Sequence, residues 1–135
     1  MTLGRRNIQY PSFAIRRTAT GLGLFALEPI PKDKRIIEYT GPLIGNEELE
    51  KKTGKYFFGV NSKWSIDGSP RSNVARYINH SCRPNAEALI HLRRVWIWSK
   101  RNIKPGEEIT YDYGREYFQT IIKPLGCKCE KCAPD

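Results

Sequence analysis

The chain has 135 residues, which is enough for one compact domain and too few for two full ones. It has no run of 18 apolar residues and no apolar segment after its charged N-terminus, so we expect neither a membrane span nor a secretory signal, and an intracellular location. The formal net charge of +9 at pH 7 is spread along the chain, which is typical of a solvated surface but leaves room for a weak contact with nucleic acid.

The first half of the chain has the pattern of short β-strands separated by turns. Thr20 to Gly23 holds two glycines and is expected to be a turn that allows close backbone approach. Asn46 is a suitable N-cap for a brief helix over residues 47–52. Apolar alternation and β-prone residues predict strands at residues 13–17, 24–27, 36–40, 56–60 and 63–67.

The second half adds further strands and one short helix. Ser72 can cap a helix over residues 73–78. Strands are expected at 86–92 and 95–99, with Arg93 and Arg94 in the turn between them. Many short strands, few helices and no alternation of strand and helix exclude a doubly wound parallel fold. We therefore predict an α+β domain, mainly β, built of several small twisted sheets.

Two tryptophans lie in the strand expected at 95–99. Trp96 and Trp98 share one face of this strand, because side chains alternate along extended chain. Burial in the core is the expected role of both rings, in preference to stacking on nucleic-acid bases.

Two polar segments are candidates for a binding site. Residues 76–85 have the sequence R-Y-I-N-H-S-C-R-P-N, a density of polar side chains that a helix interior would leave unsatisfied. Residues 106–114, G-E-E-I-T-Y-D-Y-G, place Tyr111 and Tyr113 on the same side of an extended chain. For Asn79 and His80 alone, a helix cap and a hydrogen-bonded core histidine are the alternative.

The four cysteines suggest a metal site. Cys127, Cys129 and Cys132 form C-x-C-x-x-C, so three thiolates can converge on one zinc ion from a single loop. Zinc requires four ligands in a closed structural site, and Cys82, the remaining cysteine, completes the set. Free thiols are the alternative interpretation.

These motifs together resemble a known family. T-G-L-G-L-F at 20–25, E-Y-T-G at 38–41, N-H-S-C-R-P-N at 79–85 and G-E-E-I-T-Y-D-Y-G at 106–114 resemble, in this order, the SET-domain protein lysine methyltransferases. The resemblance implies a pseudoknot in which Asn79–Asn85 threads beneath Ile109–Tyr113. It also implies an N-terminal extension, a SET domain and a post-SET tail, at residues 1–12, 13–118 and 119–135.

The resemblance also implies roles for individual residues. Tyr113 would be the key phenol of a channel for the target lysine, and Tyr111 in place of phenylalanine favours mono- or dimethylation. The remaining channel walls would be Tyr39 and Phe58. The methyl donor S-adenosylmethionine would lie against six residues: Gly21, Leu22, Tyr56, Arg76, Asn79 and His80. A structural zinc ion would be held by the four cysteines, although the last spacing is shorter than the family's commoner C-x-C-x-x-x-x-C.

Two functions follow from these observations. The leading one is methylation of a lysine in a histone tail or another protein, with S-adenosylmethionine as the donor. The alternative is a catalytically inactive, zinc-stabilised module that binds chromatin or nucleic acid, which the net charge of +9 would favour.

Overall fold

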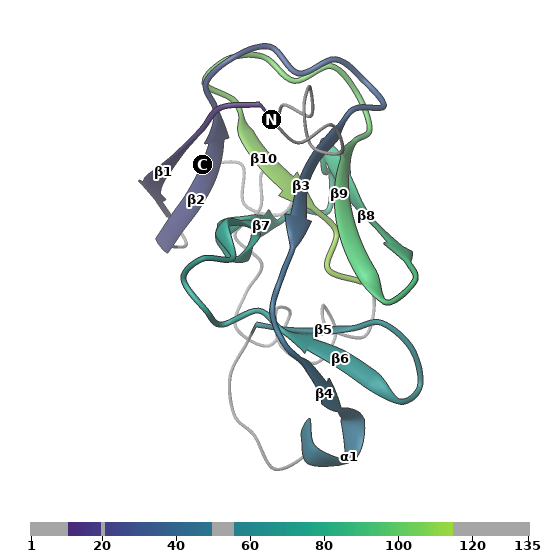
Figure 1. The fold of residues 1–135 in the computed structure, drawn as a ribbon. Helices are drawn as coiled ribbons and strands as arrows, with labels where there is room; N and C mark the ends of the chain where they lie inside the picture. Colours follow the sequence, from purple (N-terminus) through teal and green to yellow (C-terminus); the bar gives the residue numbers. More distant parts are fainter. Residues whose placement is uncertain (1–10, 20, 50–55, 115–135) are drawn as a thin grey trace, which may run out of the picture.

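The computed structural model describes residues 11–19, 21–49 and 56–114, and strands dominate these ranges (Figure 1). They contain one α-helix, α1 (Asn46–Leu49), and one 3-10 helix, η2 (Val74–Tyr77). The strands are β1 (Phe13–Thr18), β2 (Gly21–Ala26), β3 (Arg35–Tyr39), β4 (Leu43–Gly45), β5 (Phe57–Gly59), β6 (Trp64–Asp67), β7 (Asn79–His80), β8 (Ala86–His91), β9 (Arg94–Ser99) and β10 (Glu108–Tyr111). The mainly β architecture predicted from the sequence is confirmed.

The described strands form three small sheets. Their orders are β1-β2-β10-β7, β3-β9-β8 and β4-β6-β5. All neighbours are antiparallel except β7 and β10, which pair in parallel. In Figure 1 the β4-β6-β5 sheet and α1 lie at one end of the molecule, and the other two sheets lie at the opposite end. No helix of the described ranges is long and apolar enough to cross a membrane.

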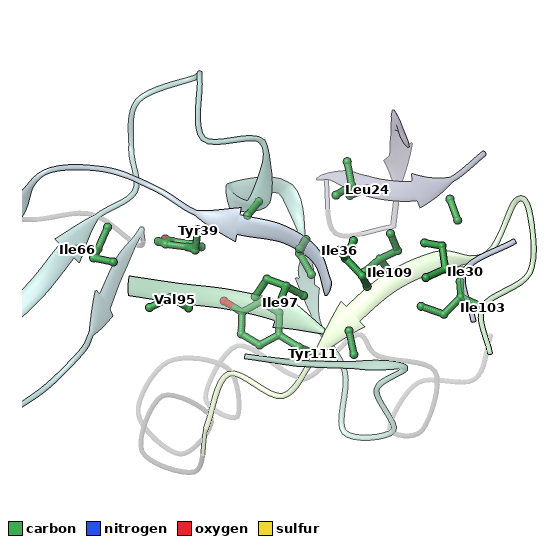
Figure 2. Packing of buried hydrophobic residues seen from close by; sticks show 14 of the residues in the cluster. Leu24, Ile30, Ile36, Tyr39, Ile66, Val95, Ile97, Ile103, Ile109 and Tyr111 are labelled. Atoms are coloured by element: carbon green, nitrogen blue, oxygen red, sulfur yellow. The ribbon is translucent and has the colours of Figure 1, made fainter. Parts of the chain in front are cut away.

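Apolar side chains from different sheets meet in one core (Figure 2). Leu24 of β2, Ile36 of β3, Ile97 of β9 and Ile109 of β10 are each fully buried. Along β9 burial alternates strictly from residue to residue, as a strand with one face on the core requires. Each such aliphatic side chain contributes about 1.5–3 kcal/mol by leaving water.

Three local predictions differ from the structure. Gly21 to Gly23 belong to β2 instead of a turn, because their backbone pairs with β1 from Thr18 back to Arg16. The helix predicted at 73–78 is a 3-10 turn over 74–77, and Asn73, not Ser72, precedes it. The side chain of Asn73 makes no capping hydrogen bond.

The two tryptophans predicted to lie in the core are only partly buried. Trp96 and Trp98 occupy the outer face of β9, and Arg35 of β3 covers them. Its guanidinium carbon lies 4.5 Å from the ring centroid of Trp96 and 5.6 Å from that of Trp98. The two indole rings therefore pack against the Arg35 guanidinium instead of against the apolar core.

The chain after β3 passes very close to the end of β6 at Gly41. Its φ is +155°, and a Cβ at this position would lie 1.9 Å from the backbone oxygen of Asp67. We predict that Gly41→Ala lowers the free energy of unfolding by about 1–3 kcal/mol, because the chain must move away from Asp67. Gly45→Ala is the control, since nothing lies within 4 Å of the added Cβ, and it should change stability by less than about 0.5 kcal/mol. Urea unfolding of both variants measures the difference; equal stabilities would contradict the prediction.

Candidate active site

Four aromatic rings form a row at the junction of the three sheets. Tyr39 ends β3, Phe58 lies in β5, Tyr111 ends β10, and Tyr113 follows two residues later. Adjacent ring centroids are 5.4 Å apart for Tyr39 and Phe58, 6.4 Å for Phe58 and Tyr111, and 5.0 Å for Tyr111 and Tyr113. All three contacts are tilted, an arrangement in which ring edges and faces attract. The structure thus brings together the four side chains predicted to line a channel.

Backbone carbonyls hold two of these phenols in place. The Tyr39 hydroxyl donates a hydrogen bond to the Tyr56 carbonyl at 2.8 Å, and the Tyr113 hydroxyl donates to the Ile78 carbonyl at 2.5 Å. A phenolic oxygen whose proton is engaged in this way can still accept a hydrogen bond through its lone pairs. The Tyr113 oxygen is therefore held as a hydrogen-bond acceptor next to Ile78, the residue before Asn79.

The segment that carries Asn79 and His80 is joined to the end of β10. β7 pairs with β10 so that Asn79 faces Thr110 and His80 faces Tyr111. The next backbone N–H, that of Ser81, donates to the Tyr111 carbonyl at 3.1 Å. These bonds place the two polar segments singled out from the sequence side by side.

The surroundings of His80 favour the neutral imidazole in one tautomer. Its Nδ1 accepts the backbone N–H of Tyr113 at 3.0 Å, so the ring proton lies on Nε2, which faces the Cys82 sulfur at 3.3 Å. Burial lowers the pKa of His80 below 6.5, although the Asp112 carboxylate, 3.8 Å from Nδ1, acts in the opposite direction. The imidazole packs edge-on against the Tyr113 ring, with centroids 5.4 Å apart.

Asn79 reaches the glycine-rich strand β2. Its Nδ2 donates to the Leu22 carbonyl at 3.0 Å and to the Glu108 carboxylate at 2.8 Å. A Cβ on Gly23 would lie 2.6 Å from that carboxylate and 3.1 Å from Nδ2. A side chain at 23 would therefore displace Glu108 and Asn79 from this contact, and of the predicted donor-binding residues Leu22 lies next to Asn79, with Gly21 directly before it in β2.

Arg76 and Tyr56 form a second contact beside the same segment. The guanidinium carbon of Arg76 lies 4.2 Å from the centroid of the Tyr56 ring and 5.2 Å from that of Tyr77. Its Nη1 donates to the Ser69 carbonyl, whereas its buried Nε has no hydrogen-bond partner among the residues that the structure describes. The six residues predicted to bind the donor thus fall into two groups, one at each end of residues 76–80.

The predicted zinc ligands are only partly described. Cys82 is partly buried and contacts His80. The other three, Cys127, Cys129 and Cys132, lie outside the described residues. Within the described part of the chain, no group of three or more His, Cys, Asp or Glu side chains is arranged to hold a metal ion.

Asn85 connects the two polar segments through hydrogen bonds that the sequence analysis did not predict. Its side chain is 2% exposed, its Oδ1 accepts the Thr110 N–H at 2.9 Å, and its Nδ2 donates to the Glu108 carbonyl at 2.7 Å. A second bond from Nδ2 reaches the Glu107 carboxylate at 3.1 Å. Its place at the end of the N-H-S-C-R-P-N motif indicated that Asn85 belongs to the site. The sequence does not show which backbone N–H and carbonyl groups its amide will bind.

Comparison with known proteins agrees with this geometry. The family model for the SET domain matches residues 21–114, which include the ring row and both polar segments. The chain belongs to the SET-domain family. Its resemblance to the family, inferred from four short motifs, is therefore confirmed.

Similar proteins include several large enzymes. The histone-lysine N-methyltransferase set-2 of Caenorhabditis elegans is 42% identical over 122 residues, covering 81% of this SET-domain chain and 8% of its own length. The probable histone-lysine N-methyltransferase set-23 of the same organism is 36% identical over 139 residues, or 89% of this chain and 57% of its own. Human histone-lysine N-methyltransferase 2D is 36% identical over 129 residues, 87% of this chain and 2% of its own. The chain thus spans less than two thirds of each of these relatives.

Proposed function

We propose that this SET domain transfers a methyl group from S-adenosylmethionine to a lysine side chain of a histone or another protein. The observation that carries the proposal is the row of four rings that ends at Tyr113, beside Asn79 and His80. The names of the relatives support it, since all three reported above are histone-lysine N-methyltransferases. If the substrate is a histone, the protein acts at chromatin.

Lysine methylation is an in-line displacement at carbon. The electron pair of the lysine Nζ forms a bond to the methyl carbon while the bond from that carbon to sulfur breaks, and the amine then loses a proton. S-adenosylmethionine supplies the methyl group as a sulfonium. The protein has to align the two reactants and to keep the amine uncharged, and alignment alone can supply about 7–11 kcal/mol.

The ring row is suited to the second task. A lysine in water has a pKa of about 10.4 and is almost fully protonated at pH 7. Between apolar walls the charged form loses hydration, which lowers the pKa of the amine, and a nearby sulfonium cation lowers it further. The faces of the same rings stabilise a methylammonium product.

Tyr113 would orient the reacting groups. Because its proton is held by the Ile78 carbonyl, its oxygen presents lone pairs to the amine or to the transferring methyl group. This is a positioning and electrostatic contribution, which a preorganised polar group can make at no cost of rearrangement.

We predict that Tyr113→Phe lowers kcat by about 100-fold or more, because the ring remains and only the oriented oxygen is lost. Binding of S-adenosylmethionine, measured by calorimetry, should persist. The control is Tyr77→Phe, which removes a phenolic oxygen outside the ring row and should keep most activity. Near-normal methylation of histones by Tyr113→Phe would exclude Tyr113 from this role.

The donor would bind against the two groups of residues at the ends of 76–80. On one side the Leu22 carbonyl lies beside the Asn79 side chain, with Gly21 and His80 as their chain neighbours, and Leu22 is 45% exposed. On the other, Tyr56 and Arg76 offer an aromatic face and a cation. These groups match a ligand that has an adenine ring and an amino-acid carboxylate, and Tyr56 also joins the donor side to the ring row, because its carbonyl accepts the Tyr39 hydroxyl.

Tyr111 would limit the number of methyl groups added. It is buried and lies between Phe58 and Tyr113, so its hydroxyl takes up room inside the row. We predict that the wild type forms mainly mono- and dimethyllysine and that Tyr111→Phe shifts the products towards trimethyllysine. Mass spectrometry of the methylated protein measures this ratio. An unchanged ratio in the variant would remove Tyr111 from this role.

We also propose that one structural zinc ion joins the post-SET tail, residues 119–135, to the SET domain at 13–118. Four thiolates, from Cys82 and the three cysteines of the tail, match the closed tetrahedral set that zinc prefers. The zinc ion would supply folding stability and clamp the tail over the channel. Residues 1–12 would be an N-terminal extension. The threading of Asn79–Asn85 beneath Ile109–Tyr113 is part of the same proposal, and the parallel pairing of β7 with β10 supports it.

The zinc site can be tested by metal analysis. Reduced, dialysed protein should contain about one zinc ion per chain, since four thiolates hold the ion firmly. Cys129→Ser should lose most of the zinc and unfold at lower temperature, because one ligand is gone. A zinc content near zero in reduced wild-type protein would favour four free thiols.

An inactive module that binds nucleic acid is the second candidate, and the net charge of +9 is the observation in its favour. Transfer of labelled methyl groups to histones distinguishes the two functions. Binding to DNA that weakens steeply with salt would report the electrostatic contact separately.

A further inference from the structure

Asn73 joins two chain segments that belong to different sheets. Its side chain is 1% exposed, and both ends of its amide are used. The Oδ1 accepts the Thr40 N–H at 3.0 Å, and the Nδ2 donates to the Gly68 carbonyl at 3.0 Å. Thr40 follows the last residue of β3 and Gly68 follows the last residue of β6. One buried amide therefore connects the ends of these two strands.

The residue before Thr40 is Tyr39, and Gly68 lies directly against its ring. A Cβ on Gly68 would be 2.4 Å from Cε1 of Tyr39 and 2.5 Å from both Cζ and the hydroxyl oxygen. The Gly68 N–H and the Tyr39 hydroxyl also share one acceptor, the Tyr56 carbonyl, at 2.7 and 2.8 Å. The position of Gly68 thus determines where the Tyr39 ring can lie.

The two segments are in contact beyond this ring. The Asp67 N–H donates to the Pro42 carbonyl at 2.9 Å, and the backbone of Gly41 approaches that of Asp67 so closely that no side chain fits between them. The Asn73 amide therefore closes a compact loop-to-loop contact next to the ring row. Loss of this amide would leave the Thr40 N–H and the Gly68 carbonyl without their partner.

We propose that Asn73 is a positioning residue for the substrate-side wall of the channel. By tying Thr40 to Gly68 it fixes the place of Tyr39 in the ring row, and thereby how well a lysine and its methylated forms fit. This inference rests on the proposed function. The backbone bonds of Asn73, to the Pro70 carbonyl and from the Arg76 N–H, do not involve its side chain, so a substitution leaves the segment leading to Asn79 connected.

Two substitutions disturb Tyr39 by different routes. Asn73→Ala removes both side-chain hydrogen bonds, so Thr40 and Gly68 are no longer tied together. Gly68→Ala adds a methyl group that must push the Tyr39 ring away. In each variant we expect kcat/KM for the histone substrate to fall by about ten- to a hundredfold, because small displacements of positioning groups have effects of this size. The KM for S-adenosylmethionine should change much less than kcat/KM for the histone substrate, because the only donor-side contact that either variant disturbs is the one from Gly68 and Tyr39 to the Tyr56 carbonyl. The ratio of mono- to dimethylated product should change as well.

Matched controls separate positioning from stability. Ser99 is also buried and also connects backbone groups, donating from Oγ to the Pro31 carbonyl at 2.6 Å and accepting the Lys34 N–H at 2.8 Å. None of these residues takes part in the ring row, so Ser99→Ala should lower stability without a selective effect on the histone substrate. Gly45→Ala is the control for an added methyl group. All variants are assayed well below their measured unfolding temperatures.

The outcomes distinguish this inference from the proposed function. A selective loss of histone kcat/KM with an altered product ratio in Asn73→Ala and Gly68→Ala, absent from both controls, would support it. An active wild type whose Asn73→Ala and Gly68→Ala variants keep the wild-type product ratio, or lose affinity for both substrates equally, would overturn the inference alone. A wild type that transfers no methyl group would overturn the proposed function, and the inference with it.

Discussion

The parallel pairing of β7 with β10 is the constraint on which the candidate site depends. It involves only Asn79 and His80 on one strand, and so short a ladder is not stable by itself. Side chains reinforce it, because His80 accepts the N–H of Tyr113 and Asn85 bonds to the backbone on both sides of Ile109. The result is a Tyr113 hydroxyl fixed against the Ile78 carbonyl, which no contact within either strand could achieve.

The ring row exists only where three sheets meet. Each described sheet has three or four strands and contributes one ring, and Tyr113 follows the end of β10. Tyr39 and Tyr111 are almost completely buried, and a buried hydroxyl without a partner would be costly. A backbone carbonyl is a partner for the hydroxyls of Tyr39 and Tyr113 that takes up the phenolic proton and fixes the ring. The same bonds therefore serve both stability and the chemistry proposed for Tyr113.

Short-range patterns predicted much of this fold. Alternation identified β1, β3, β8 and β9 to within one or two residues, and the motifs identified which side chains meet in the ring row. The prediction failed where backbone pairing or a side chain from another strand decides. Gly21 to Gly23 lie in β2 because their backbone pairs with β1 from Thr18 back to Arg16, so the chain turns before Gly21. Trp96 and Trp98 are only partly buried, because they lie on the outer face of β9, where Arg35 of the neighbouring strand covers them.

The buried asparagines show most clearly why sequence alone was insufficient. Asn73 was expected merely to begin a helix, yet its amide binds Thr40, 33 residues earlier in the chain. An apolar side chain of similar volume would fill the same space but would leave two backbone groups unpaired at the end of β3 and β6. An amide there favours one relative position of the two strands over all others. For the lysine channel proposed here, whose width would distinguish a lysine from its methylated forms, a unique position of Tyr39 would matter more than the small net stability that such bonds add.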